Sequence, residues 1–216
     1  MGSDLQTCSD GELVRQCQDG SLTAFEELVY RYEDRIYGFV SNACGSFADA
    51  RELTQDTFVR AFQAIAQFDH RRAFAPWLFT IARRKCIDHY RSAEWRLRSV
   101  ECSVGSTESG TGNEERADEA DPGELLARQE ERQRLWGLAR RRLTEPQFEV
   151  IWLRYVEGMS VADIAGVLRK TQTHVKVLLF RARQVLAREL RAGQGTPSAG
   201  GVASWTDLIP GGQGVR

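Results

Sequence analysis

Apolar side chains in the first hundred residues recur at steps of three and four, in three stretches. The first stretch runs through Leu22, Phe25, Leu28, Val29, Tyr32, Ile36, Phe39 and Val40. The second occupies residues 50–68 and runs through Leu53, Thr57, Phe58, Ala61, Phe62 and Ile65, with Gly45 between it and the first. The third is expected from about residue 75 to 91, through Trp77, Leu78, Ile81, Ala82 and Ile87. Such steps place an apolar stripe along one face of a helix, so the pattern predicts three amphipathic helices.

The second half of the chain carries clearer helix boundaries. Thr144-Glu145-Pro146-Gln147 has the residue types of a capping box with proline in the first turn, and it precedes an apolar face of Phe148, Ile151, Trp152 and Tyr155. Gly158 is expected to end that helix, and Ser160 to open a short one that reaches about Leu168. Thr171 is the next N-cap, before a longer basic helix. Helix, tight turn, short helix, tight turn and longer helix is a helix-turn-helix order.

Two segments lack such periodicity. Residues 99–123 are rich in Ser, Gly, Glu and Asp, and nearly free of large apolar groups, which is typical of a mobile linker. The last 25 residues contain seven glycines around a short apolar cluster of Trp205, Leu208 and Ile209, a candidate docking element. The chain is therefore expected to be all-α. It should have two small helical domains, 10–98 and 126–191, joined by a flexible acidic linker, 99–125, and followed by a flexible Gly-rich tail, 192–216.

Composition removes several classes of function. No apolar run approaches the length of a membrane span, and the start of the chain lacks the pattern of a signal peptide, so we expect a cytoplasmic protein without membrane insertion. The five cysteines are widely spaced and form no C-x-x-C pair, and the three histidines fall in no metal-ligand spacing. We expect reduced thiols, and neither a metal ion nor another cofactor.

Charge is segregated along the chain although its formal net value is only −1. Residues 71–98 carry eight basic and two acidic side chains, and residues 132–191 carry thirteen basic and five acidic ones. Between them, residues 99–131 carry two basic and ten acidic side chains. Two basic helical blocks on either side of an acidic strip favour a protein that binds a polyanion such as nucleic acid.

The motifs of the two blocks resemble a known family. DARELTQDTFVRAFQAIAQFD and FAPWLFTIARRKCIDHYR are similar to the second conserved region of the extracytoplasmic-function (ECF) sigma factors, which belong to the sigma-70 family. LTEPQFEVIWLRYVEGMSVADIAGVL, with HVK and FRARQVLARELR after it, is similar to their fourth region. The resemblance covers about 170 residues in the family's order. It implies a protein that binds core RNA polymerase through the beta-prime and beta subunits, brings it to promoter DNA and is held by an anti-sigma factor.

The resemblance also assigns sites residue by residue. It implies a polymerase-binding face formed by Glu52, Gln55, Asp56 and Arg60. It implies that an element from Phe68 to Arg91 recognises and melts the −10 region, with Phe68, Asp69, Arg71, Arg72, Phe74, Arg83, Arg84, Lys85, Asp88 and Arg91. It implies contacts to the −35 element from Thr171, Gln172, Thr173, His174, Lys176, Arg181 and Arg183. Arginine and lysine can neutralise phosphates, whereas an aromatic ring such as Phe74 serves equally well in a core.

The sequence departs from the family's usual pattern at three places. Arg169 and Lys170 stand where a glycine and an apolar anchor are usual, which costs about 1 kcal/mol if the site needs a positive φ. Val177 and Leu178 stand where the recognition helix usually has a small polar residue and an arginine, which removes an expected DNA contact and enlarges the apolar face. An unusual −35 sequence, a weaker dependence on the −35 element and a protein partner at this helix are the three alternatives. Arg84 replaces an asparagine that is common in the helix that reads the −10 region.

Two other functions compete with a sigma factor. A stand-alone regulator, or a sigma-like protein without initiation activity, would bind duplex DNA through residues 126–191 without the polymerase. A nucleic-acid enzyme would need a nucleophile or a metal-binding carboxylate cluster, but Glu26/Glu27 and Glu33/Asp34 are adjacent pairs that point to different helix faces. We therefore expect a protein that is not an enzyme. Two interpretations of the acidic linker remain open: it mimics nucleic acid within the polymerase, or it simply tethers the two domains.

Overall fold

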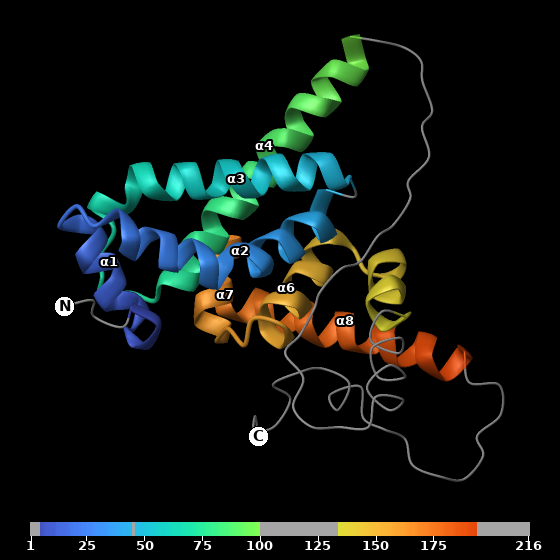
Figure 1. Ribbon diagram of the computed structural model, residues 1–216. Coiled ribbons are helices and arrows are strands. Elements are labelled where there is room, and N and C mark those ends of the chain that lie inside the picture. The colour runs from blue at the N-terminus through green and yellow to red at the C-terminus, as the bar shows by residue number, and fades with distance from the viewer. Residues whose placement is uncertain (1–4, 45, 100–133, 194–216) are drawn as a thin grey trace, which may run out of the picture. The chain divides into compact units, whose positions relative to one another are not determined.

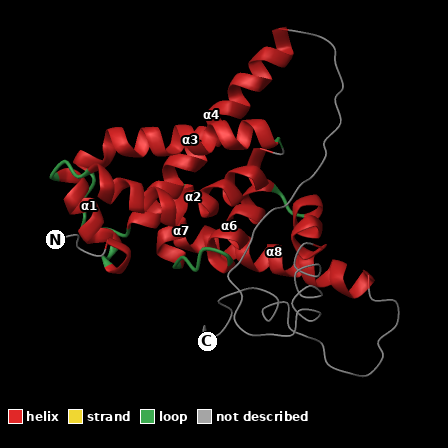
Figure 2. Ribbon diagram, in the orientation of Figure 1, coloured by secondary structure: helices red, strands yellow, loops and turns green. Residues whose placement is uncertain are grey.

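The structure, a computed structural model, describes residues 5–44, 46–99 and 134–193. These residues form helices joined by short turns, and no strand occurs among them (Figures 1 and 2). The all-α prediction is therefore confirmed. The chain divides into two compact units, Met1–Asn113 and Glu114–Arg216. Both the linker beyond Ser99 and the tail with Trp205 lie outside the described residues, so their flexibility stays a prediction.

The described residues of the first unit form four α-helices and two short 3₁₀ turns. They are η1 (Leu5–Thr7), α1 (Asp10–Gln18), α2 (Leu22–Cys44), α3 (Phe47–Ala64), η2 (Ile65–Gln67) and α4 (Phe74–Ser99). Helices α2 and α3 pack along each other, α4 packs on both, and its C-terminal part projects beyond them (Figure 1). Helix α4 extends eight residues beyond Arg91, near which the prediction ended it. In the sequence after Arg91 the two large apolar residues, Trp95 and Leu97, stand two apart, so the three- and four-residue step gave no helical signal there.

Helix α1 was not predicted, although its N-terminus carries a recognisable signal. Ser9 and Glu12 form a capping box: the Ser9 N–H donates to the Glu12 carboxylate at 2.8 Å, and the Glu12 N–H donates to Ser9 Oγ. Arg31 of α2 fixes the segment before it by donating to the carbonyls of Leu5 and Cys8, both at 2.8 Å. The hydrogen bond to Glu27 raises the pKa of Arg31, so this anchor keeps its charge.

The core of the first unit lies where α2, α3 and α4 meet. Phe79 is fully buried and packs edge-to-face on Phe39, with ring centroids 5.3 Å apart. The predicted stripes account for most of the buried side chains, including Leu28, Ile36 and Leu78. Two members of the stripes are wrong as core residues, because Leu22 is 64% exposed and Phe62 is 47% exposed.

Two cysteines lie close together where α2 packs on α4, so their cross-linking can test this packing. Cys44 Sγ and Cys86 Sγ lie 4.0 Å apart, close enough for a small side-chain rotation to bring them to disulfide distance. Burial raises the pKa of Cys17 to about 11, so little of this thiol is in the reactive thiolate form and it should oxidise slowly. Diamide treatment is therefore expected to give an intramolecular Cys44–Cys86 disulfide before any other pair.

Peptide mapping by mass spectrometry under non-reducing conditions measures this cross-link. Cys44→Ser is the control and should leave Cys86 as a free thiol. A pairing of Cys86 with Cys17 instead would contradict the packing of these helices.

The second unit contains the helix-turn-helix that the sequence predicts. Residues 134–142 are helical, and they are followed by α6 (Glu145–Tyr155), α7 (Val161–Leu168) and α8 (Gln172–Gly193). Helices α6 and α7 both pack on α8. The three predicted helix starts are confirmed. Gln147 Oε1 accepts from the Thr144 N–H at 3.0 Å, Ser160 Oγ from the Asp163 N–H at 3.1 Å, and Thr171 Oγ1 from the His174 N–H at 3.2 Å.

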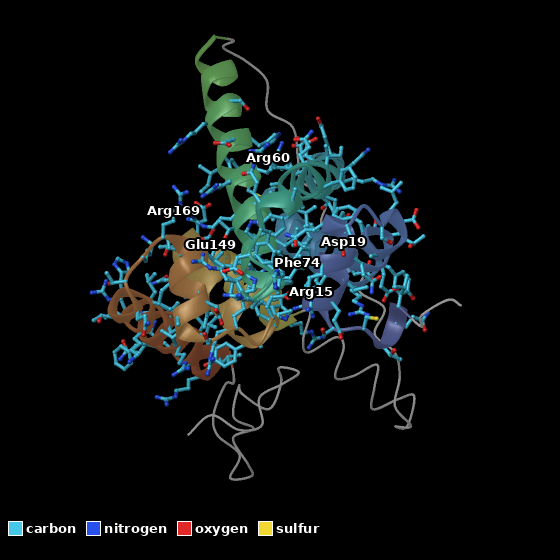
Figure 3. All side chains as sticks on the ribbon, turned by 90° about the vertical axis from the view of Figure 1, so that its left-hand side faces the viewer. Arg15, Asp19, Arg60, Phe74, Glu149 and Arg169 are labelled. Atoms are coloured by element: carbon cyan, nitrogen blue, oxygen red, sulfur yellow. The ribbon has the colours of Figure 1, made fainter. Side chains whose placement is uncertain are left out.

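The turn between α7 and α8 needs a left-handed residue. Arg169 caps α7 with φ +52° and ψ +46°, and it is the one non-glycine residue with a positive φ among those that the structure describes. The Lys170 N–H donates to the Ala165 carbonyl at 2.9 Å, as in a Schellman motif. The site therefore does need a positive φ. Arg169 (Figure 3) adopts there a conformation that a glycine would adopt without strain.

Arg169→Gly is expected to stabilise the second unit by about 0.5–1 kcal/mol, because it removes the strain of a side chain at positive φ. Amide hydrogen exchange of α7 and α8 measures the change locally, as a two- to five-fold rise in protection. Lys170→Gly is the matched control and should not stabilise, since no positive φ is recorded there. Equal effects of the two variants would contradict the strain argument.

Candidate functional surfaces

An open groove of about 950 Å³ runs between α2 and α3. Its apolar lining comes from both helices: Phe25, Val29 and Tyr37 from α2, and Phe58, Val59 and Phe62 from α3. Phe25 and Phe62 meet edge-to-face at 5.0 Å between ring centroids. Val59 and Phe62 remain 49% and 47% exposed, which is unusual for large apolar side chains on neighbouring helix turns. The exposed residues Glu33, Asp34, Arg51 and Gln55 also line the groove, and we call them its polar rim and the apolar lining its floor. The groove therefore has the composition of a docking surface.

The predicted polymerase-binding residues divide between two sides of α3. Gln55 lines the groove, and Glu52 is exposed three residues before it. Asp56 instead accepts from Lys85 Nζ of α4 at 2.8 Å. Arg60, labelled in Figure 3, is exposed one helical turn after Asp56. Phe62 was missed from the sequence because periodicity placed it in the core-facing stripe, and Val59 was missed because it lies outside that stripe.

The loop between η2 and α4 is organised by an acid. The carboxylate of Asp69 accepts from the Arg71 N–H at 3.1 Å, and its carbonyl accepts from the Arg72 N–H at 2.9 Å. Through this Asx turn Asp69 stabilises the loop conformation. The side chains of Arg71 and Arg72 are exposed beside it, and they present two positive charges on the loop.

Phe68 and Phe74, which the resemblance assigns to the element that recognises the −10 region, have buried rings in this structure. Phe68 is 7% exposed and Phe74 (Figure 3) is 3% exposed. Phe74 packs edge-to-face on Tyr32 at 5.3 Å, and Phe68 lies 4.6 Å from Trp77, between ring centroids. Gln18 holds the loop down by donating to the carbonyl of Phe68 at 2.7 Å. In this structure both rings serve the fold, so a contact of Phe68 or Phe74 with a base stays a prediction and would require the ring to leave the core.

The polar residues of α4 fall into two groups. Arg84, Asp88 and Arg91 are exposed and share one face, since they lie four and three residues apart. Arg83 and Lys85 are half-buried, and Lys85 is already engaged by Asp56. The structure thus separates two accessible cations, Arg84 and Arg91, from a cation that must leave its carboxylate before it can meet a phosphate.

The predicted −35 residues lie on the first twelve residues of α8 and on the turn before it. Six of the seven line up along the exposed part of the helix: Gln172, Thr173, His174, Lys176, Arg181 and Arg183. Thr171 caps the helix through its hydroxyl. The guanidinium of Arg183 lies over the ring of Tyr155, 5.5 Å from its centroid, and donates to its hydroxyl. This contact positions Arg183 rather than leaving it free to move.

Val177 and Leu178, the two apolar residues of α8 that differ from the family's usual pattern, differ in exposure. Leu178 is 9% exposed and belongs to the core of the helix-turn-helix. Val177 is 41% exposed and faces outward. The sequence alone had left both as candidates for an enlarged apolar surface, but only Val177 contributes to one, together with the exposed Phe180.

Two classes of site find no support in the part of the chain that is described. No group of three or more His, Cys, Asp or Glu residues in these ranges could hold a metal ion. None of the described helices combines the length and the apolar character needed to cross a bilayer.

Two family descriptions match the two units. Sigma-70 region 2 matches residues 28–96, and Sigma-70 region 4 matches residues 138–186. The first match contains all of the groove lining except Phe25, together with most of α4, and the second contains α6, α7 and most of α8. Together they place both candidate surfaces in regions of one family.

Individual relatives agree. The chain is 37% identical over 181 residues to the ECF RNA polymerase sigma factor BldN of Streptomyces coelicolor, and this match covers 83% of the chain and 65% of BldN. It is 27% identical over 182 residues to the RNA polymerase sigma-H factor of Pseudomonas aeruginosa, which covers 84% of the chain and 94% of that relative.

Solved structures extend the similarity to the fold. CnrH, in complex with the cytosolic domain of CnrY, is 26% identical with a TM-score of 0.57, over 85% of this chain and 97% of CnrH. RpoE of Bartonella quintana, in complex with the anti-sigma factor NepR, has a TM-score of 0.63 at 20% identity, over 80% of this chain and all of RpoE, and so shows the fold alone. With both regions matched in order and ECF relatives aligned across most of its length, the chain belongs to the ECF sigma factors of the sigma-70 family.

Proposed function

We propose that this chain directs transcription initiation by binding core RNA polymerase with its first unit and promoter DNA with both. One observation carries the proposal. A single chain joins an apolar-floored, polar-rimmed groove on α2 and α3 to a helix-turn-helix whose α8 presents cations and no carboxylate from Gln172 to Arg188. Neither a DNA-binding module nor a polymerase-docking module needs the other, whereas an initiation factor needs both.

The polymerase contact is proposed at the groove, together with Glu52, Gln55 and Arg60. Exposed apolar side chains at the centre of a polar rim supply the area that is removed from water on binding, and the charges around them orient the partner. The beta-prime and beta subunits are the proposed partners. Asp56 has a separate role, because its contact with Lys85 fixes α3 against α4.

The −10 contact is proposed at the exposed cations of the loop and of α4: Arg71, Arg72, Arg84 and Arg91. Arginine neutralises phosphates and stacks on exposed bases, and both are needed where duplex DNA is opened. The −35 contact is proposed at the N-terminal half of α8, since the N-terminal residues of a recognition helix reach the base edges of the major groove.

A partner protein that restrains the factor is also proposed. CnrH, which is 26% identical to this chain, was solved in complex with the cytosolic domain of CnrY, and RpoE was solved with the anti-sigma factor NepR. An anti-sigma factor that covers the groove would compete with polymerase for the same apolar floor. We propose no catalytic role for the chain.

Transcription with purified core polymerase on a genomic fragment library tests the proposal. Start sites should cluster downstream of a shared two-part sequence, and omission of the chain should abolish them. A stand-alone regulator would instead bind one duplex site tightly without polymerase and would give no new transcripts. Failure to co-purify with core polymerase would overturn the proposed function.

A further inference from the structure

The outward face of α8 has an apolar centre. At 100° per residue, Thr173, Val177, Phe180 and Gln184 fall along one stripe, opposite the buried stripe. The buried stripe consists of Val175, Leu178, Leu179, Ala182 and Leu186. Val177 is 41% exposed and Phe180 is 60% exposed. These two side chains therefore stand at the part of the helix that points furthest from its own domain.

The charges beside this stripe identify what covers it. Lys176 and Arg181 are exposed on its two sides, and no acidic residue occurs from Gln172 to Arg188. A protein surface that buried Val177 would have to place acidic groups against these cations, whereas duplex DNA offers a phosphate on each side of a groove. Charge complementarity thus favours the major groove of DNA as the occupant.

Within the major groove, an apolar side chain has one specific target. Adenine, guanine and cytosine present only donors and acceptors there, while thymine also presents its 5-methyl group. Valine has no donor or acceptor to offer, so it cannot read the other three bases by hydrogen bonding. An outward valine in this position selects for a methyl group.

We propose that Val177 is a specificity-determining residue of this chain, which contacts the 5-methyl group of a thymine in the −35 element. The inference rests on the proposed function and deepens it. Val177 is the sixth residue of α8, within the part of a recognition helix that reaches the bases. Its β-branched side chain has one strongly preferred rotamer in a helix, so its two methyl groups are held in place. Phe180 lies about 4.5 Å further along the axis and flanks the contact.

The test replaces each −35 thymine of a promoter, on either strand, by deoxyuridine, which removes only the methyl group. Holoenzyme binding is measured for the wild-type chain and for Val177→Ala. At one position the wild-type holoenzyme should lose about four-fold in affinity, the expected effect of one buried methyl group. The Val177→Ala holoenzyme should bind the thymine and uracil promoters equally well. Thymines in the spacer provide the DNA control.

Three results would overturn the inference. One is a −35 element that contains no thymine on either strand. Another is a set of uracil promoters that the wild-type holoenzyme binds as well as the thymine promoter. The third is a uracil effect of the same size in Val177→Ala, because the methyl group would then be read by another residue. These outcomes differ from failure of the proposed function, in which the holoenzyme would not form or would initiate without any −35 sequence.

Discussion

Phe62→Glu is expected to weaken binding to core RNA polymerase by at least about 100-fold. The side chain is 47% exposed in the free protein, so a glutamate there can remain hydrated and the first unit should stay folded. On docking, the same carboxylate would be buried without a counter-ion, which costs about 3–5 kcal/mol.

The matched control is Tyr30→Glu. Tyr30 is an aromatic residue of α2 that is 71% exposed but does not line the groove, so its replacement should leave polymerase affinity within about two-fold. Affinity is measured by competition with a labelled wild-type chain, and thermal melting of each variant confirms the fold. Equal affinities for Phe62→Glu and wild type would remove the groove from the polymerase interface.

The contrast between Phe62 and Phe79 shows how far periodicity reaches. Both belong to aromatic-rich helices, yet Phe79 is fully buried and Phe62 forms the floor of an open groove. A three- and four-residue step reports that a side chain avoids water. It does not report whether the covering surface belongs to the same chain or to a partner. For this reason the sequence predicted the helices well but placed Phe62 of the groove in the core-facing stripe.

Local signals gave the turns and caps more accurately. Thr144, Ser160 and Thr171 were predicted as N-caps from residue type and spacing, and each makes its capping contact. A cap depends on a few neighbouring atoms, so the sequence contains nearly all of its determinants. The same holds for Arg169, whose left-handed conformation follows from the turn that must separate α7 from α8.

Contacts between residues far apart in the chain could not be predicted from the sequence pattern. The Asp56–Lys85 pair joins residues that had been assigned to two different sites, and Gln18 reaches the loop at Phe68 from fifty residues away. Such pairs depend on the packing angle of whole helices rather than on any local pattern. They also change function, because a lysine held by a carboxylate is a weaker phosphate ligand than an arginine with its face open to solvent.

The double variant Arg84→Ala/Arg91→Ala is therefore expected to reduce promoter opening by about 100-fold while polymerase binding is kept. Two charge-assisted contacts at about 1.5 kcal/mol each give this loss. If both arginines meet phosphates, the slope of log affinity against log salt should also fall by about two. Open complexes are measured by permanganate footprinting over a salt series.

Lys85→Ala is the matched comparison on the same helix. Lys85 is also a cation of α4, but its bond to Asp56 must break before it can contribute to DNA binding, so its loss should leave the salt slope nearly unchanged. Its cost should appear instead in the stability of the first unit, at about 1 kcal/mol or less for a pair that is partly exposed. A salt slope that falls in Lys85→Ala and stays unchanged in the arginine variant would reverse the assignment. The phosphate contact would then belong to the half-buried face of α4.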